Sequence, residues 1–172
     1  MTASTHYGDL LKRQAELQTL GNMPPATLEQ VRVALLTEIG ELAQELKPDW
    51  AWWRKAGDAR TVNPERVLSE AADVLHFALL LDLNLGVERG GGNLTPWWDA
   101  QKCPVTYHLT TLPTWVCPDP DDRQQAWGLC IAKDLCTILQ VYGFTPDDLA
   151  RAYWEKSEEN LRRWREAREG QA

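Results

Sequence analysis

Apolar residues recur every three or four positions along residues 28–46, and this spacing constrains the fold more than any other feature of the chain. The stripe consists of Leu28, Val31, Leu35, Ile39, Leu42 and Leu46. An α-helix turns once every 3.6 residues, so these steps place all six side chains on one helical face. Thr27, with Gln30 three residues later, forms a capping-box pattern before the stripe, and Pro48 follows it. The pattern predicts one amphipathic helix with a buried face.

Four further segments show the same period and are bounded by helix start and stop signals. They cover approximately residues 7–20, 64–85, 123–142 and 146–168. Pro64 and Pro146 occupy first-turn positions, where proline is tolerated, and Gly86 and Gly143 follow the last turns. Five main helices in 172 residues predict an all-α helical bundle that forms a single domain over residues 1–172.

Residues 86–122 separate the third and fourth predicted helices and contain many helix-breaking residues. Their prolines are Pro96, Pro104, Pro113, Pro118 and Pro120. We therefore expect a long irregular insertion here, and residues 106–110 and 114–116 are compatible with a small β-hairpin. A connection of this length in a compact helical domain usually has a function or forms an oligomer contact, and the sequence leaves its role open.

Composition and charge exclude several classes of protein. Eighteen Lys and Arg against 25 Asp and Glu give a net charge of −7 and argue against a protein that coats nucleic acid. No apolar run is long enough to span a membrane, and residues 1–6 lack the apolar stretch of a signal peptide. The four cysteines form no C-x-x-C pair, which disfavours a zinc site. We expect a cytoplasmic protein with no nucleic-acid polymer or membrane as partner.

Two predicted helices each carry a pair of acids three residues apart at the edge of the buried face. The pairs are Glu38 with Glu41, and Glu70 with Asp73. A spacing of three places both members of a pair on one side of a helix. Four carboxylates near a core repel one another and lose hydration, so they need positive charge nearby. Mg²⁺ prefers carboxylate oxygens and retains positions for water and phosphate, and Mn²⁺ is an expected substitute.

Two other interpretations of these acids remain open. A solvated acidic flank is the simpler interpretation of any one residue, but both pairs border apolar stripes. A di-iron site would need two Glu-x-x-His motifs, and Asp73-x-x-His76 is only a partial match. His6 and His108 provide no second copy on a predicted helix, so we favour a hard cation. His76 lies off the apolar stripe, and we expect it to be structural or to support a ligand rather than bind the metal.

The last predicted helix carries a row of polar and basic residues on one face. Tyr153, Lys156, Asn160 and Arg163 are spaced by three, four and three residues. Arginine binds phosphate oxygens as a fork and lysine binds them as a point charge. The row therefore suits a phosphate group held beside the acids. The alternative is an exposed face that pairs with nearby acids.

These motifs resemble those of a known enzyme family. Glu38-Ile39-Gly40-Glu41, 28 intervening residues and Glu70-Ala71-Ala72-Asp73 resemble the E-x-x-E…E-x-x-D signature of the all-α nucleoside triphosphate pyrophosphatases. Within this MazG-related superfamily the chain is most similar to the dimeric dUTPases. The additional similarity lies in Trp50–Trp53, in Asp73-Val74-Leu75-His76-Phe77 and in the row from Tyr153 to Arg163. The resemblance covers residues 18–163 except the insertion.

The resemblance implies an enzyme that hydrolyses a nucleoside triphosphate to the monophosphate and pyrophosphate. The implied substrate is dUTP, and the implied assembly is a homodimer. It implies that Glu38, Glu41, Glu70 and Asp73 hold the metal and that Glu38 also orients and deprotonates the attacking water. Two other functions stay open. One is a MazG-like housekeeping pyrophosphatase for another or a damaged nucleotide, and the other is a helical interaction protein without catalytic activity.

The resemblance also implies which residues hold the substrate. The pyrophosphate oxygens would contact Lys156 and Arg163, and Asn160 would contact the sugar or a phosphate. The base would contact Gln18 and Asn22, which match an early Gln/Asn motif, although Gln14 is an alternative to Gln18. Completing the nucleoside pocket, Trp53 would form a wall and Phe77 would pack on the deoxyribose.

Overall fold

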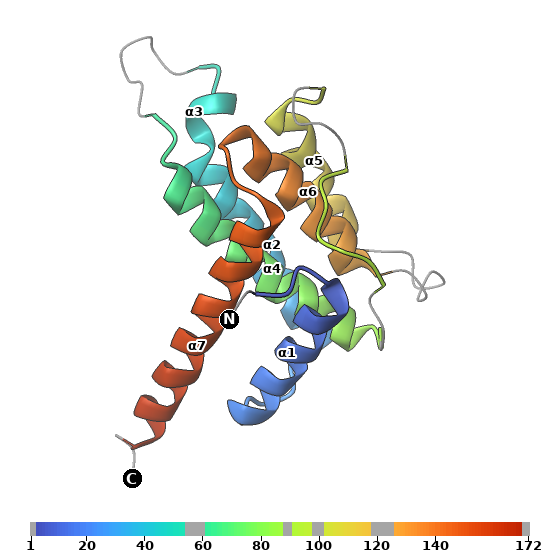
Figure 1. Ribbon diagram of the computed structural model, residues 1–172, viewed down its shortest axis with the longest axis vertical. Coiled ribbons are helices and arrows are strands. Elements are labelled where there is room, and N and C mark those ends of the chain that lie inside the picture. Colours follow the sequence, from blue (N-terminus) through green and yellow to red (C-terminus); the bar gives the residue numbers. More distant parts are fainter. Residues whose placement is uncertain (1–2, 54–60, 88–90, 98–101, 118–125, 170–172) are drawn as a thin grey trace.

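The computed structural model describes residues 3–53, 61–87, 91–97, 102–117 and 126–169. Within them the chain forms seven helices, and their arrangement is shown in Figure 1. The helices are α1 (Tyr7–Leu20), α2 (Leu28–Glu45), α3 (Lys47–Trp50), α4 (Pro64–Asn84), α5 (Val105–Val116), α6 (Trp127–Val141) and α7 (Pro146–Glu169). The described residues contain no strand, only one isolated antiparallel bridge between His6 and Asn93. The predicted all-α bundle is confirmed.

Local capping explains where the predicted helices begin. The Thr27 side chain accepts a hydrogen bond from the Gln30 amide over 3.2 Å, and the Gln30 side chain accepts one from the Thr27 amide over 2.8 Å. Asn63 caps α4 by accepting from the amides of Glu65 and Arg66. These caps satisfy amides that have no partner inside the helix. The predicted start of α6 near residue 123 lies outside the described residues.

The insertion is more helical than the sequence suggested, and the predicted hairpin is wrong. Residues 105–116 form α5, with Pro113 inside it. The helix buries Val105, His108, Leu112 and Val116, whose spacing of three, four and four is itself helical. Packing of this face against α6 and α2 outweighs the hydrogen bond that Pro113 cannot donate. Pro118 and Pro120 lie outside the described residues.

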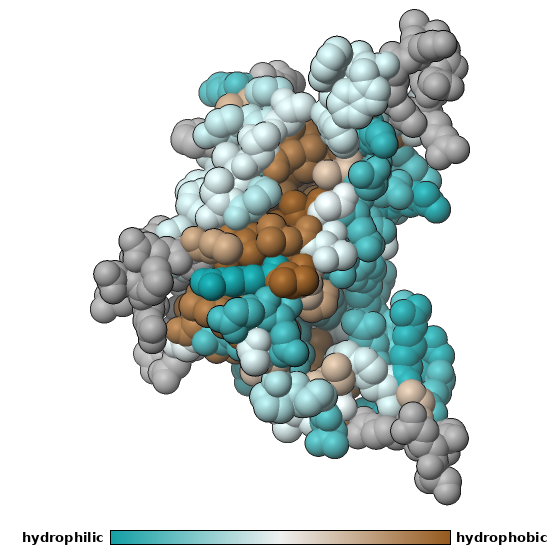
Figure 2. Space-filling model, turned by 180° about the vertical axis from the view of Figure 1, so that it is seen from behind, coloured by the Kyte–Doolittle hydropathy of each residue, from teal (hydrophilic) through white to brown (hydrophobic). Residues whose placement is uncertain are grey.

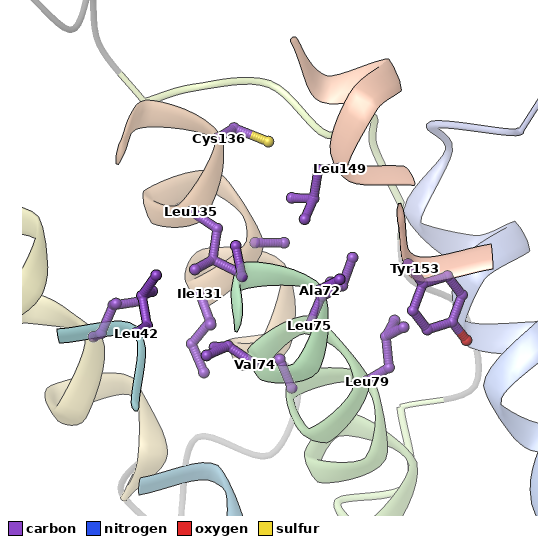
Figure 3. Packing of buried hydrophobic residues seen from close by; sticks show 14 of the residues in the cluster. Leu42, Ala72, Val74, Leu75, Leu79, Ile131, Leu135, Cys136, Leu149 and Tyr153 are labelled. Atoms are coloured by element: carbon purple, nitrogen blue, oxygen red, sulfur yellow. The ribbon is translucent and has the colours of Figure 1, made fainter. Parts of the chain in front are cut away.

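Helix α4 is the centre of the bundle and packs against α1, α2, α6 and α7. Its buried leucines and valines meet Leu42 of α2, Ile131 and Leu135 of α6 and Tyr153 of α7 in one cluster (Figure 3). Gly128 lets α6 approach α4 closely, because a Cβ at this position would collide with the Ala78 carbonyl and the Tyr7 hydroxyl. This packing fixes the positions of the residues that α4 and its neighbouring helices present to one another.

No helix in the described part of the chain combines the length and the apolar character that crossing a bilayer requires.

Candidate active site

Packing of α2 against α4 brings three of the four predicted acids together. Glu38 and Glu41 project from α2, and Glu70 projects from α4. One carboxylate oxygen of each residue lies within 4.8 Å of the others. Glu38 and Glu70 are half-buried, whereas Glu41 is exposed. We call these three residues together with Asp73 the acid cluster.

The fourth acid, Asp73, forms an ion pair with a lysine of α7. Asp73 follows Glu70 by one turn of α4, and its Oδ2 accepts a hydrogen bond from the Lys156 ammonium. Both side chains are about one-quarter exposed, at 28% for Asp73 and 25% for Lys156. The structure therefore assembles the acid cluster and one predicted phosphate-binding residue from three helices.

Mutual repulsion and burial perturb the ionisation of the acid cluster. The pKa of Glu38 is raised from 4.5 to about 7, first by burial and then by the charges of Asp73, Glu41 and Glu70. The pKa of Glu70 is also raised, first by burial and then by Asp73. Lys156 acts in the opposite direction on both groups. A carboxylate with a pKa near neutrality is suited to accept a proton at physiological pH.

The donor atoms of the acid cluster fit a hard divalent cation. Such ions bind carboxylate oxygens, and Mg²⁺ uses few protein ligands because it keeps several waters. The cluster offers three convergent carboxylates and a fourth one turn away. A cation at this position would also offset the repulsion that raises the pKa of Glu38.

One face of α4 connects the acid cluster to a pocket at the other end of the helix. Glu70, Asp73, Phe77, Leu80 and Asn84 follow one another at spacings of three and four residues. Residues so spaced share a face, and Leu80 lies about 10 Å beyond Asp73 along the axis. Phe77 is half-buried between these two positions. The row therefore runs continuously from the acids to the pocket.

The pocket at the far end of this row contains the predicted base-binding residues. Its volume is about 570 Å³, and the ends of α1 and α4 and the following loop line it with Gln18, Asn22, Met23, Leu80 and Asn84. Sequence reasoning missed Leu80 and Asn84. The sequence contained a signal for both residues, because they continue the spacing of three and four residues beyond Phe77.

Gln14 and His76 belong to the core instead. His76 Nδ1 lies 2.9 Å from Gln14 Oε1, and the Tyr153 hydroxyl donates to the same oxygen over 3.1 Å. Burial, followed by the charges of Lys156 and Arg13, lowers the pKa of His76 to about 3. A neutral histidine fixed in this way agrees with the structural role predicted for it. Gln18, which lines the pocket, is better placed than Gln14 to meet a ligand.

The remaining predicted site residues are Trp53, Asn160 and Arg163. Trp53 is 57% exposed and packs edge-on against Trp50, with ring centroids 5.4 Å apart. It follows α3, which Figure 1 places at the opposite end of the bundle from the C-terminal end of α1. The structure therefore does not bring Trp53 to the pocket of Gln18.

On α7, the Arg163 side chain is 63% exposed and pairs with Glu159 one turn earlier. Asn160 is half-buried. Trp164, which follows Arg163 in the chain, lies against Gly21 at the end of α1. The C-terminal half of α7 thus accompanies the pocket end of α1, and Arg163 is not brought to the acid cluster.

Comparison with known proteins assigns the chain to a family. A family model described as dUTPase matches residues 8–167, which include the acid cluster, the α4 row and Lys156. Comparisons with curated proteins and with solved structures gave no match. Because the family model spans nearly the whole chain, the protein belongs to the all-α dimeric dUTPase family and is a dUTP diphosphatase-like enzyme.

Proposed function

We propose that the protein hydrolyses dUTP to dUMP and pyrophosphate in a reaction that depends on Mg²⁺, for which Mn²⁺ can substitute. The observation that carries this proposal is the convergence of Glu38, Glu41 and Glu70 within 4.8 Å, beside the Asp73–Lys156 pair. Family membership supports a pyrophosphatase acting on nucleoside triphosphates. The choice of dUTP and of the metal is our proposal.

Each acid has a role in this proposal. Glu38, Glu41, Glu70 and Asp73 would hold the cation, which when bound lowers the pKa of water and neutralises charge that develops on the phosphate. Glu38 orients the water that attacks the α-phosphorus and accepts its proton. Its raised pKa supports this assignment, since a base is most effective when its pKa is near the working pH.

Lys156 and Arg163 bind the pyrophosphate oxygens in this proposal, and Asn160 binds the sugar or a phosphate. Lys156 is already beside the acid cluster. Arg163 lies toward the Gln18 end of the row, so this role would require its side chain to leave Glu159 and extend back toward the acid cluster; leaving Glu159 costs little because pairs between exposed side chains are weak. Its long side chain and two-pronged donor geometry then suit a phosphate group.

The α4 row supports the placement of the nucleoside. A triphosphate at the acid cluster can extend along Phe77 toward Gln18 and Asn22, in the direction of the 570 Å³ pocket. Phe77 would pack on the deoxyribose and disfavour a 2′-hydroxyl. Gln18 and Asn22 carry both donors and acceptors and would bind the edge of the uracil.

We also propose that the protein is a homodimer that covers the outer face of α2. Val33 and Leu36 on this face are 65% and 43% exposed. Figure 2 shows hydrophobic side chains gathered on the back of the bundle, toward which α2 lies in Figure 1. Large exposed apolar patches usually mark an interface. Sedimentation with Val33→Asp tests this proposal, because the charge should yield a folded monomer.

The deciding experiment measures pyrophosphate release from dUTP, dCTP, dTTP and UTP, each with and without Mg²⁺. Preference for dUTP, with release abolished by chelation, supports the proposal. Preference for another triphosphate would favour the MazG-like housekeeping role instead. Absence of release from all four, together with no calorimetric binding of Mg²⁺–nucleotide, would support the non-catalytic interaction protein.

A further inference from the structure

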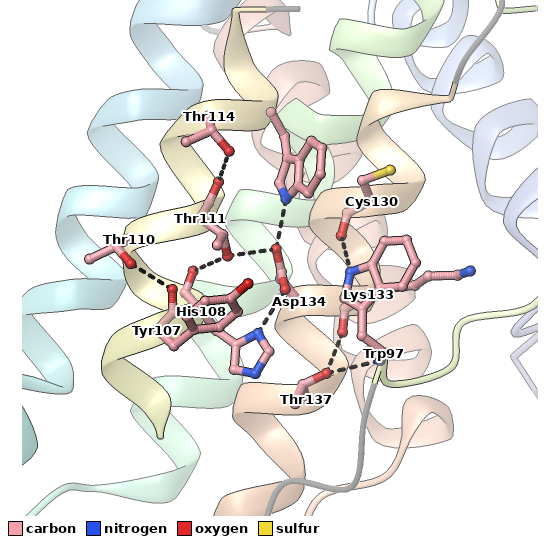
Figure 4. Close-up of polar contacts among 11 residues, drawn as sticks. Trp97, Tyr107, His108, Thr110, Thr111, Thr114, Cys130, Lys133, Asp134 and Thr137 are labelled. Carbon is pink, nitrogen blue, oxygen red and sulfur yellow. Dashed lines mark hydrogen bonds and ion pairs between the residues drawn. The ribbon is translucent and has the colours of Figure 1, made fainter. Parts of the chain in front are cut away.

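A second pocket lies in the groove between α5 and α6, apart from the acid cluster on α2, α4 and α7. Its volume is about 230 Å³, and it is lined by Trp97, Tyr107, Thr111, Trp115 and Asp134. Figure 4 shows Tyr107 on the α5 side and Trp97 on the α6 side, with Asp134 between them. None of these residues has a role in the proposed hydrolysis.

The floor of this pocket is a buried carboxylate that no Lys or Arg of the described residues contacts as an ion pair. Asp134 is 3% exposed and accepts hydrogen bonds from His108 Nδ1 over 2.8 Å, from the Thr111 hydroxyl over 3.0 Å and from the Trp115 indole over 2.7 Å. The Thr111 and Trp115 donors are uncharged, and His108 offsets the carboxylate charge only when it is protonated. No Lys or Arg in the described ranges forms an ion pair with Asp134. A buried negative charge of this kind favours a positive ligand.

The walls of the pocket are aromatic rings, two of which are held in place. The Trp97 indole donates to the Cys130 carbonyl over 3.2 Å, and the backbone amide of Trp97 donates to the Thr137 hydroxyl over 3.1 Å. Trp115 is held by its bond to Asp134 and packs on Trp127. Aromatic faces attract cations through the ring quadrupole. The Lys133 ammonium, 4.5 Å from the Trp97 ring centroid, already makes this interaction from outside the pocket lining.

We propose that this pocket binds an alkylated ammonium group. Three aromatic side chains line the space together with the Asp134 carboxylate, and aromatic rings beside a carboxylate are the chemistry that recognises quaternary ammonium ions. A hard metal ion would need several oxygen ligands, and among the described residues Asp134 is the one carboxylate that lines the pocket. An anion would be repelled by the same carboxylate. The volume of 230 Å³ limits the ligand to a small head group.

Calorimetry with choline and with its uncharged isostere 3,3-dimethylbutan-1-ol tests the proposal on the full chain. We expect choline to bind at least about fivefold more tightly, because the alcohol has the same shape but gains no cation–π attraction. Tyr107→Leu should weaken choline binding by a similar factor, whereas Tyr107→Phe keeps the ring face and should retain it. Tyr107 is half exposed, so neither variant threatens the fold.

Asp134→Asn provides a second test because it removes the charge at nearly constant size. It should weaken choline binding while leaving the weaker binding of the alcohol unchanged, with a melting curve to verify folding. A peptide with trimethyllysine, compared with free choline, distinguishes a protein side chain from a small molecule as the source of the group. Pyrophosphate release by Tyr107→Leu should equal that of the wild type, so this test is independent of the proposed hydrolysis.

The proposal is overturned if choline does not bind, if the alcohol binds as tightly as choline, or if Tyr107→Leu binds choline as well as Tyr107→Phe does.

Discussion

Helix α4 presents one carboxylate near its middle, Asp73, and one near its C-terminal end, Asp82, and the two are accommodated in opposite ways. Asp82, near the C-terminal end, is completely buried and accepts hydrogen bonds from the Tyr7 hydroxyl and the Gly128 amide, each over 2.9 Å. Asp73, nine residues earlier, is partly exposed and faces Glu38 and Glu70 as well as Lys156. The C-terminal end of α4 meets donors that satisfy a single acid, whereas its middle part meets other acids.

This difference separates a carboxylate with a structural role from one to which we assign a functional role by proposal. Burial raises the pKa of Asp82 to about 6, although amides at the start of α6 and the Tyr7 hydroxyl oppose the increase. Asp82 thereby connects α4 to α1 and α6. In the acid cluster, neighbouring charges add to the effect of burial. Uncompensated acids are unfavourable for the bundle alone, which is expected where a ligand supplies the missing charge.

The largest expected effect comes from removing one charge from the acid cluster. Glu41→Gln should lower turnover by about a hundredfold or more, the size of effect seen when one key electrostatic contact to a transition state is lost. Its melting temperature without metal should stay equal or rise, because repulsion with Glu38 is reduced. Pyrophosphate release and thermal melting measure the two effects. Near-wild-type activity would contradict the assignment of this residue to the metal site.

Near the C-terminal end of α4 we expect the opposite result, a loss of stability with activity retained. Asp82→Ala leaves the Tyr7 hydroxyl and the Gly128 amide without their acceptor, at a cost of about 1–3 kcal/mol for each buried donor. Urea unfolding measures this loss. Activity per folded molecule should be retained at temperatures where the variant is folded. If folded Asp82→Ala were inactive, the division between a structural Asp82 and a functional acid cluster would be wrong.

In the metal-free protein, the acid cluster should make the free energy of unfolding depend on pH. The pKa of Glu38 is about 7 in the folded chain against an ordinary value of 4.5, so the folded state binds the proton more tightly. The free energy of unfolding should therefore fall as pH rises from about 4.5 to 7 and level off above 7.

Thermal melting at a series of pH values, with and without Mg²⁺, measures this dependence. Glu38→Gln should flatten the decrease, and Mg²⁺ should restore stability at the higher pH values. A decrease of the same size in Glu38→Gln would assign it to other groups.

The smallest expected effect concerns the competition between Lys156 and the metal. The Lys156 ammonium pairs with Asp73, so it competes with a cation for that carboxylate. Lys156→Met should tighten Mg²⁺ binding by about two- to fivefold, the worth of a partly exposed ion pair, while slowing turnover. Calorimetry and pyrophosphate release measure the two effects. Weaker Mg²⁺ binding in this variant would show that Lys156 supports the site rather than competing for it.

The helices that position the site were predictable because their signals are local. The apolar period, the Thr27–Gln30 capping box and the Asn63 cap act within one or two turns. The pairing of Glu38 with Glu41 follows from the same geometry. The period of α5 was equally visible, but Pro113 and the β-branched residues around it outweighed that signal, and packing on α6 decided the outcome.

Residues whose roles depend on distant partners were not predictable. A lone buried acid has no sequence signature, so Asp82 and Asp134 appeared only with their donors. Gln14 and Gln18 are chemically identical, and only the packing of α1 on α4 and α7 places the first in the core and the second in the pocket.

The sequence by itself determined five of the seven described helices, the faces they bury and the family of the enzyme, because periodicity and motif spacing are properties of contiguous residues. The tertiary structure alone decided that Glu70 meets Glu38 and Glu41, that Lys156 reaches Asp73, and that the α5–α6 groove has a negative floor. These contacts join residues far apart in the chain, and side-chain packing between helices sets their distances.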